Sequence, residues 1–186
     1  MKYYYDLHIH SILSSDADLL MTPNNIMNMA NLKGLQIISI TDHNSLKQIP
    51  AFMTLSESYD MLLIPGVELA VKEGYHLLVY FKSFEEAMKF DLEIEPYQSQ
   101  SKHHVNEDTQ WIMNAHDEPI HQLTYDLTQR LTCDLDTLYQ LLKNYEHIKV
   151  AAHIERPNTS MIDQIKDYQV DAVEITLYAK DRIKKP

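Results

Sequence analysis

Short apolar stretches that alternate with helix-like stretches constrain the fold of this chain more than any other feature. Residues 35–43 and 61–69 are apolar runs of the length that buried strands have. Residues 22–34 show a helical pattern instead, with Pro23 suited to the first turn and Gly34 to the end. Strands that alternate with helices predict an α/β fold with a mainly parallel sheet or a barrel.

The same patterns extend along the chain, which we interpret as a single domain over residues 1–186. We expect strands at residues 3–10, 35–43, 61–69, 75–81, 147–155 and 171–178, and helices at residues 22–34, 50–59, 83–94, 134–145 and 160–168. Ser83 and Glu86 predict a capping box at the start of one helix. Residues 96–132 lack both patterns, and we interpret them as an irregular insertion with a hairpin around residues 117–119.

Composition narrows the class of protein. A formal charge of −11 argues against non-specific nucleic-acid binding, which needs a basic surface, but does not exclude a phosphorylated substrate. No apolar run reaches the roughly 18 residues of a membrane span, and the N-terminus lacks the apolar core of a signal peptide. We therefore expect a cytoplasmic protein. The only cysteine, Cys133, lies beside aspartates that would raise its pKa, so we do not expect it to act as a nucleophile.

Histidines and a glutamate at the ends of predicted strands suggest a metal site. His8 and His10 are two residues apart in a strand, so their side chains project from the same face. His43, Glu68 and His153 each lie at the end of another apolar run. Strand ends on one rim of an α/β fold are where sites are built, so we expect these side chains to meet. His76, near the start of a strand, is a further candidate.

Four motifs make the chain resemble the PHP family, named for its polymerase and histidinol phosphatase members. They are "DLHIHS", "ITDHNS", "IPGVEL" and "AAHIERP", and they occur in the order of the family, at strand ends, over nearly the whole chain. The chain is most similar to the short, stand-alone bacterial members. This resemblance implies a distorted (β/α)7 TIM-like barrel with up to three divalent metal ions at one rim. It also implies phosphoester hydrolysis.

The resemblance implies a set of metal ligands. They are His8, His10, Asp18, His43, Glu68, His76 and His153. His8 and His10 would bind the first metal, with Glu68 as a bridge. His43 and an acid would bind the second metal, and His76 and His153 the third.

The acid of the second site has two candidates. Asp18 has the spacing to Pro23 found in some relatives, whereas Asp16 has the offset from His8 found in others, and we favour Asp18. We expect Asp6 to accept a hydrogen bond or to orient a ligand histidine rather than to bind metal, and Asp42 to do the same for a neighbour.

One family motif is missing. The family ends with an Asp-x-His motif on its last strand, and nothing like it follows residue 171. Either the sequence stops before that motif, or the chain is a natural variant with an incomplete site and barrel. His116, Asp117 and His121 are conceivable substitute ligands, and the alternative is that they belong to a solvated loop.

The function that these residues predict is a metal-dependent phosphoesterase, in which a metal-bound hydroxide attacks a small phosphorylated metabolite or nucleotide. Mixed nitrogen and oxygen ligands favour Mn, Fe or Zn, with Mg as an alternative. Glu68 and Arg156 are the candidate catalytic residues, with Arg156 as a phosphate clamp or, alternatively, in a surface salt bridge with Glu155. Metal affinity should fall below about pH 6.5 as the histidines become protonated.

Two other functions remain open from the sequence. One is a nuclease that acts on short oligonucleotides. The other is a degenerate module that binds metal, a ligand or a partner without catalysis. The oligomeric state is not predicted.

Overall fold

A curled, mixed β-sheet forms the centre of the computed structural model, which describes residues 2–101 and 108–176. Its strands are β1 (Tyr5–Ile9), β2 (Ile37–Ile40), β3 (Leu62–Ala70), β4 (His76–Phe81), β7 (His147–Ala151) and β8 (Ala172–Val173), hydrogen-bonded in that order. β1, β2 and β3 are parallel to one another, and β7 is parallel to β8. β4 is antiparallel to both β3 and β7.

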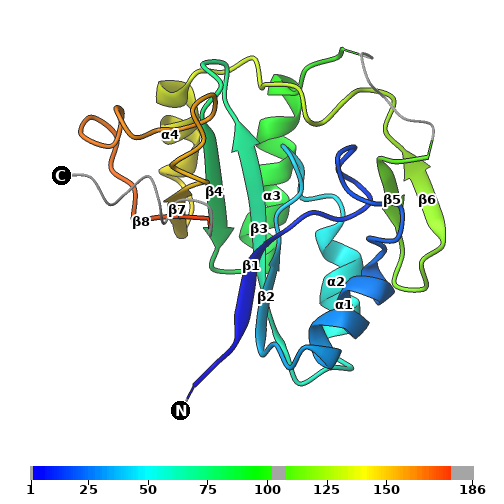
Figure 1. Ribbon diagram of the computed structural model, residues 1–186. Helices are drawn as coiled ribbons and strands as arrows, with labels where there is room; N and C mark the ends of the chain where they lie inside the picture. The colour runs from blue at the N-terminus through cyan, green and yellow to red at the C-terminus, as the bar shows by residue number, and fades with distance from the viewer. Residues whose placement is uncertain (1, 102–107, 177–186) are drawn as a thin grey trace.

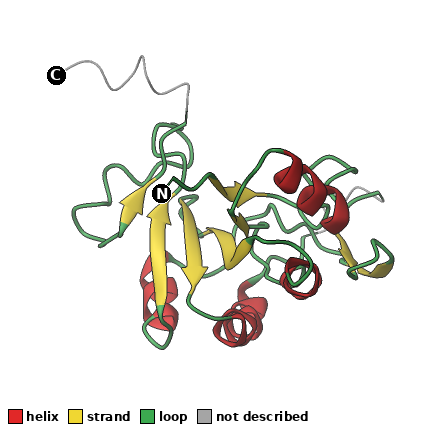
Figure 2. Cartoon of the chain, turned by 90° about the horizontal axis from the view of Figure 1, so that it is seen from below, coloured by secondary structure: helices red, strands yellow, loops and turns green. Residues whose placement is uncertain are grey.

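Four α-helices cover one face of this sheet, and Figure 2 shows them along one side of the curved row of strands. They are α1 (Pro23–Leu32), α2 (Ile49–Ser56), α3 (Phe84–Ile94) and α4 (Leu135–Leu142), and a short 3-10 helix, Glu95–Tyr97, follows α3. Residues such as Ile38, Val67 and Phe90 are fully buried in the core between the sheet and the helices. None of the helices in the described ranges is long and apolar enough to cross a membrane.

The predicted side-chain cap is present at the start of α3, whereas α1 begins without one. The Ser83 side chain accepts a hydrogen bond from the backbone N–H of Glu86, as a capping residue does. Pro23 opens α1 as expected, but the Thr22 hydroxyl does not cap the helix and instead donates to Asp117 Oδ2 at 2.7 Å. Asp117 lies in the predicted hairpin, which is confirmed as β5 (Trp111–Met113) and β6 (Pro119–Gln122). This contact fastens the hairpin to the start of α1 (Figure 1).

The fold differs from the sequence-based expectation in three respects. The sheet is mainly parallel as predicted, with only β4 reversed among its six described strands, but these strands form a half-barrel, so a closed (β/α)7 barrel is not confirmed. Within residues 160–168 the structure has turns at 162–167 rather than a regular helix, with both i−3 and i−4 hydrogen bonds, such as Gln164 N–H and Ile165 N–H to Met161 O. β8 is short, and residues 177–178 of the strand expected there lie outside the described residues.

Strand directions bring five chain segments to one rim of the sheet. β1, β2 and β3 all run toward this rim, and His43, just after β2, forms a bridge with Glu68 near the end of β3. β4 is reversed, so its first residue, His76, pairs with Ala70 at the same rim. β7 ends there too, and His153 follows it by two residues.

Candidate metal centre

The Glu68 carboxylate lies at the centre of a cluster of five imidazole rings. Glu68 is buried, with a relative exposure of 1%. Its Oε2 atom is 3.3 Å from His8 Nε2, 3.0 Å from His10 Nε2 and 3.4 Å from His43 Nδ1. Its Oε1 atom is 2.9 Å from both His76 Nδ1 and His153 Nε2. The two oxygens therefore face two different groups of nitrogens.

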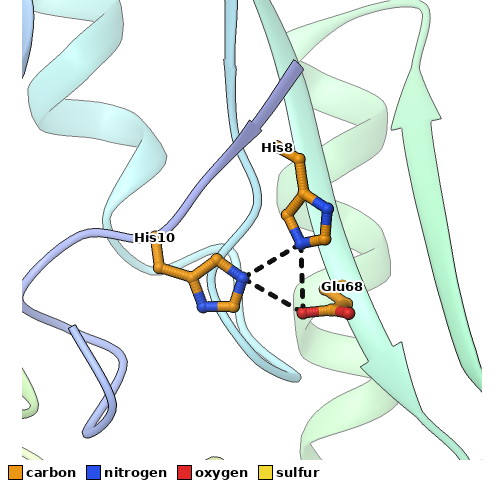
Figure 3. Close-up of side chains that lie close together, drawn as sticks. All are labelled: His8, His10 and Glu68. Atoms are coloured by element: carbon orange, nitrogen blue, oxygen red, sulfur yellow. Dashed lines mark hydrogen bonds and ion pairs between the residues drawn. The ribbon is translucent and has the colours of Figure 1, made fainter. Parts of the chain in front are cut away.

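Figure 3 shows how His8 and His10 reach Glu68 from the end of β1. The two Nε2 atoms lie 3.1 Å apart, as expected of side chains on one face of an extended segment. Asp6, two residues before His8, accepts a hydrogen bond from the His8 backbone N–H at 3.2 Å. The Asp6 side chain thus contacts the backbone of His8 rather than the His8 ring.

The structure brings Asp16, and not Asp18, to the cluster. Asp16 Oδ2 lies 3.2 Å from His43 Nε2, and Asp16 Oδ1 lies 3.5 Å from His10 Nδ1. The Asp18 side chain instead accepts a hydrogen bond from the backbone N–H of Leu20 in an exposed turn. The geometry therefore favours Asp16, the alternative acid, as the candidate ligand.

Asp42 explains the path of the loop that carries Asp16. Its buried carboxylate accepts hydrogen bonds from Ser11 N at 2.7 Å, Ser11 Oγ at 2.6 Å and Ser14 Oγ at 2.8 Å. Ser14 Oγ in turn accepts from the backbone N–H of His43 at 3.1 Å. Asp42 therefore accepts hydrogen bonds, one of the two roles that we expected, and holds the loop of residues 11–16 against the end of β2.

A turn with unusual backbone geometry presents His153 to Glu68. His153 has a φ of 29°, in a left-handed region that non-glycine residues rarely adopt. The Thr159 hydroxyl lies 3.0 Å from His153 Nδ1, and the Thr159 carbonyl accepts from the backbone N–H of His76 at 3.2 Å. One residue thus contacts both histidines that face Glu68 Oε1.

Asp16, Glu68 and the five histidines of the cluster line a cavity of about 510 Å³. Arg156 and a glutamate that we did not identify from the sequence also line it. That residue is Glu174, whose Oε1 atom lies 2.9 Å from His8 Nδ1. It comes directly after β8, so the rule that identified Glu68, an acid at the end of an apolar run, applies to it as well. Glu155 does not join the cavity and accepts from Thr176 N at 3.2 Å.

The proposed substitute ligands lie elsewhere. His116 and His121 are exposed and do not line the cavity. Asp117 lies in the hairpin, where it accepts from Thr22 and from Asn24 N at 2.9 Å. Substitution by these residues is therefore not supported, and two other histidines of the insertion, His103 and His104, lie outside the described residues.

The ionisable side chains of the cluster strongly shift one another's pKa values. Burial opposes the charging of His8, but the Glu174 and Glu68 carboxylates outweigh it and raise the pKa of His8 to about 9. Burial likewise opposes the charging of His10, whose pKa Asp16 and Glu68 raise to about 10. The same contacts outweigh burial at Glu68 and Asp16 and hold the pKa of each carboxyl well below its usual range.

The donor set fits divalent cations. Nδ1 of His10 and Nδ1 of His43 are buried without a hydrogen-bond partner. Within the described residues, three groups have ligand atoms that lie within 4.8 Å of one another: His8, His10 and Glu68; His10, Asp16 and His43; and His43, Glu68 and His76. Imidazole and carboxylate donors in this mixture are typical of Zn, Mn and Fe sites.

Solved structures of other proteins resemble the fold of this chain. The chain resembles a protein from Bifidobacterium adolescentis proposed to be a metal-dependent phosphoesterase (16% identity, TM-score 0.63, 97% of this chain and 82% of that one). It also resembles a lesion-specific endonuclease from Pyrococcus furiosus (19% identity, TM-score 0.64, 93% of this chain and 42% of that one). Both likenesses show the fold.

One curated relative is the uncharacterized protein MJ1587 of Methanocaldococcus jannaschii. It is 30% identical over a stretch that covers 37% of this chain, and the chain spans 45% of that relative's length. The model of the PHP domain matches residues 6–168, which include every histidine of the cluster. The chain therefore belongs to the PHP domain family.

Proposed function

We propose that this protein is a metal-dependent phosphoesterase that hydrolyses a small phosphorylated metabolite or nucleotide. The observation that carries the proposal is the convergence of five imidazole nitrogens on the two oxygens of one buried carboxylate. The proposed ligands are His8, His10, Asp16, His43, Glu68, His76 and His153. The proposed ions are Mn, Fe or Zn, with Mg as an alternative, up to three in number.

Glu68 has the geometry of a bridging ligand. Its Oε2 atom faces His8, His10 and His43, whereas its Oε1 atom faces His76 and His153. A carboxylate in this position can hold two cations close together and offset their charge. Bound cations would supply Lewis acidity and a water that ionises near neutral pH.

Arg156 is the proposed phosphate clamp. It is the only arginine or lysine among the cavity-lining residues in the described part of the chain. Its backbone N–H donates to His153 O at 2.8 Å, so the same turn carries both side chains. A planar guanidinium can donate two parallel hydrogen bonds to a phosphate and neutralise charge that develops there. A lysine in its place would keep the charge but lose the paired geometry.

Hydrolysis of a chromogenic phosphate ester with added Mn tests the proposal. We expect turnover by the unaltered chain, and a loss of at least about 100-fold in Glu68→Gln because its bridging charge is removed. Asp16→Asn and Asp18→Asn form a matched pair, and only the former should lower activity. Arg156→Lys should raise KM more than it lowers kcat. Metal content by elemental analysis should show at least one ion per chain, and a chain that purifies and assays without any metal dependence would refute the proposal.

A nuclease is the second candidate. It is favoured by the likeness to an endonuclease, and by a related Endonuclease Q complex with a 27-mer duplex that carries an abasic lesion at the active site. The net charge of −11 weighs against it, because phosphate backbones bind basic surfaces. Cleavage of an oligonucleotide in preference to the small ester would favour the nuclease. Metal binding without either activity would favour a non-catalytic module.

A further inference from the structure

Glu174 connects the two edge strands of the sheet at the candidate metal centre. β1 and β8 are the first and last strands of the sheet and do not pair with each other. Glu174 follows Val173 of β8, and its Oε1 atom lies 2.9 Å from Nδ1 of His8 on β1. The side chains are half-buried, with exposures of 28% and 19%. Water therefore competes only in part for this contact.

The contact determines which nitrogen of His8 carries a hydrogen. A carboxylate accepts hydrogen bonds and cannot donate them, so Nδ1 of His8 must be the protonated nitrogen. In the neutral ring, Nε2 is then left with a free lone pair. That nitrogen faces the centre, 3.3 Å from Glu68 Oε2 and 3.1 Å from His10 Nε2.

Glu174 is itself held in place at three points. Its Oε2 atom accepts from the backbone N–H of His153 at 2.8 Å. Its backbone N–H donates to Ala151 O at 2.9 Å, and its carbonyl accepts from Ile154 N at 3.0 Å. The carboxylate is therefore a fixed reference against which the His8 ring is aligned. Because it contacts Nδ1, the nitrogen of His8 that does not face Glu68, its geometry is not that of a metal ligand.

We infer that Glu174 is a positioning residue, which orients the His8 ring and keeps its Nε2 atom free to bind a cation. This inference rests on the proposed metal-dependent function. It assigns a role to the residue that follows the last described strand, in a region where the Asp-x-His motif of the family is absent. Carboxylates that accept from the second nitrogen of a ligand histidine typically change metal affinity about 10- to 100-fold.

The test compares two carboxylates that fasten the same segment to the same turn. Glu174 contacts His8 and the turn at His153. Glu155, in that turn, accepts from Thr176 instead and makes no hydrogen bond to a histidine ring of the described residues. The full chain is stripped of metal and titrated with Zn by calorimetry, as the unaltered protein, Glu174→Ala, Glu174→Gln and Glu155→Ala. Circular dichroism checks the fold of each variant.

We expect Glu174→Ala to weaken Zn binding about 10- to 100-fold and Glu155→Ala to weaken it less than about threefold. Glu174→Gln should be intermediate, because an amide can accept from His8 or from His153 N–H but not from both. In the Zn-loaded protein, proton NMR should show a slowly exchanging Hδ1 on His8 that disappears in Glu174→Ala. If that variant does not fold, the near-isosteric Glu174→Gln gives the same readouts.

Three results would overturn the inference. Equal Zn affinity in Glu174→Ala and the unaltered chain would remove the role of Glu174 and leave the metal centre standing. An equal loss in Glu174→Ala and Glu155→Ala would show that both merely fasten residues 172–176. An unaltered chain that binds no Zn would refute the proposed function itself, and with it this inference.

Discussion

Protons and metal ions compete for the same nitrogens, so metal affinity should depend steeply on pH. The pKa of His8 is raised to about 9 and that of His10 to about 10, in each case because neighbouring carboxylates outweigh burial. These shifts favour the protonated form of each ring at pH 7 before a cation binds. A charged imidazole has no lone pair to offer, so each ring must lose a proton when the metal enters.

The magnitude follows from the number of protons displaced. Binding to both rings at a pH well below their pKa values releases about two protons, so Kd rises about 100-fold for each pH unit lost. Between pH 8 and pH 6 the change is about four orders of magnitude, or about 5 kcal/mol. Metal affinity therefore falls as pH falls; the fall begins near pH 10, the pKa of His10, and steepens below about pH 9, the pKa of His8. The sequence alone placed this window below about pH 6.5, the value for an isolated histidine.

Calorimetric titration with Mn at pH 6, 7 and 8 measures this dependence directly. Repeating each titration in two buffers with different ionisation enthalpies counts the protons released. His116→Ala is the matched control, since His116 is exposed and does not line the cavity, and its slope should equal that of the unaltered chain. A Kd that changes less than about threefold per pH unit would mean that both rings are already neutral, and would refute the reasoning.

Three further predictions concern stability. Removing metal with a chelator should lower Tm by about 5–10 °C, because a ligand at 100 times its Kd stabilises by about 2.7 kcal/mol, and an unchanged Tm would contradict this. Asp42→Ala should lower the free energy of unfolding in urea by about 3 kcal/mol, since three donors from Ser11 and Ser14 lose their acceptor. Gly66→Ala should cost about 2 kcal/mol in the same assay, because its Cβ would lie 2.4 Å from Ser39 Oγ; a loss below about 0.5 kcal/mol would show that the side chain moves away freely.

The local sequence pattern was sufficient to predict most of the residues that form the cluster around Glu68. His8 and His10 alternate along one strand, and His43 and Glu68 end two neighbouring parallel strands, so residue type and strand period already place them on one rim. The choice between Asp16 and Asp18 was different in kind. It depends on hydrogen bonds that Ser11 and Ser14, in a loop about 30 residues earlier in the chain, donate to Asp42, and no local pattern records such a contact.

Residues 160–168 show the limit of periodicity as a signal. Their apolar spacing is helical, but the segment is short, and tertiary packing decides the conformation of such segments. Met161 is buried, and Thr159, just before it, contacts the ring of His153. Thr159, which comes just before these turns, lies beside the candidate metal centre. The conformation in the folded protein therefore differs from the helix that the apolar spacing favours.

The direction of β4 could have been predicted, and the position of His76 depends on it. The chain leaves β3 at Ala70 and enters β4 at His76, whereas a parallel crossover needs a dozen or more residues. The connection includes Gly74 at a φ of +94°, as a tight turn requires. A parallel β4 would have placed its first residue at the rim opposite Glu68. The reversed strand instead pairs His76 with Ala70 and brings its Nδ1 atom to 2.9 Å from Glu68 Oε1. The sheet remains mainly parallel, and the short connection explains why β4 alone is reversed among its described strands.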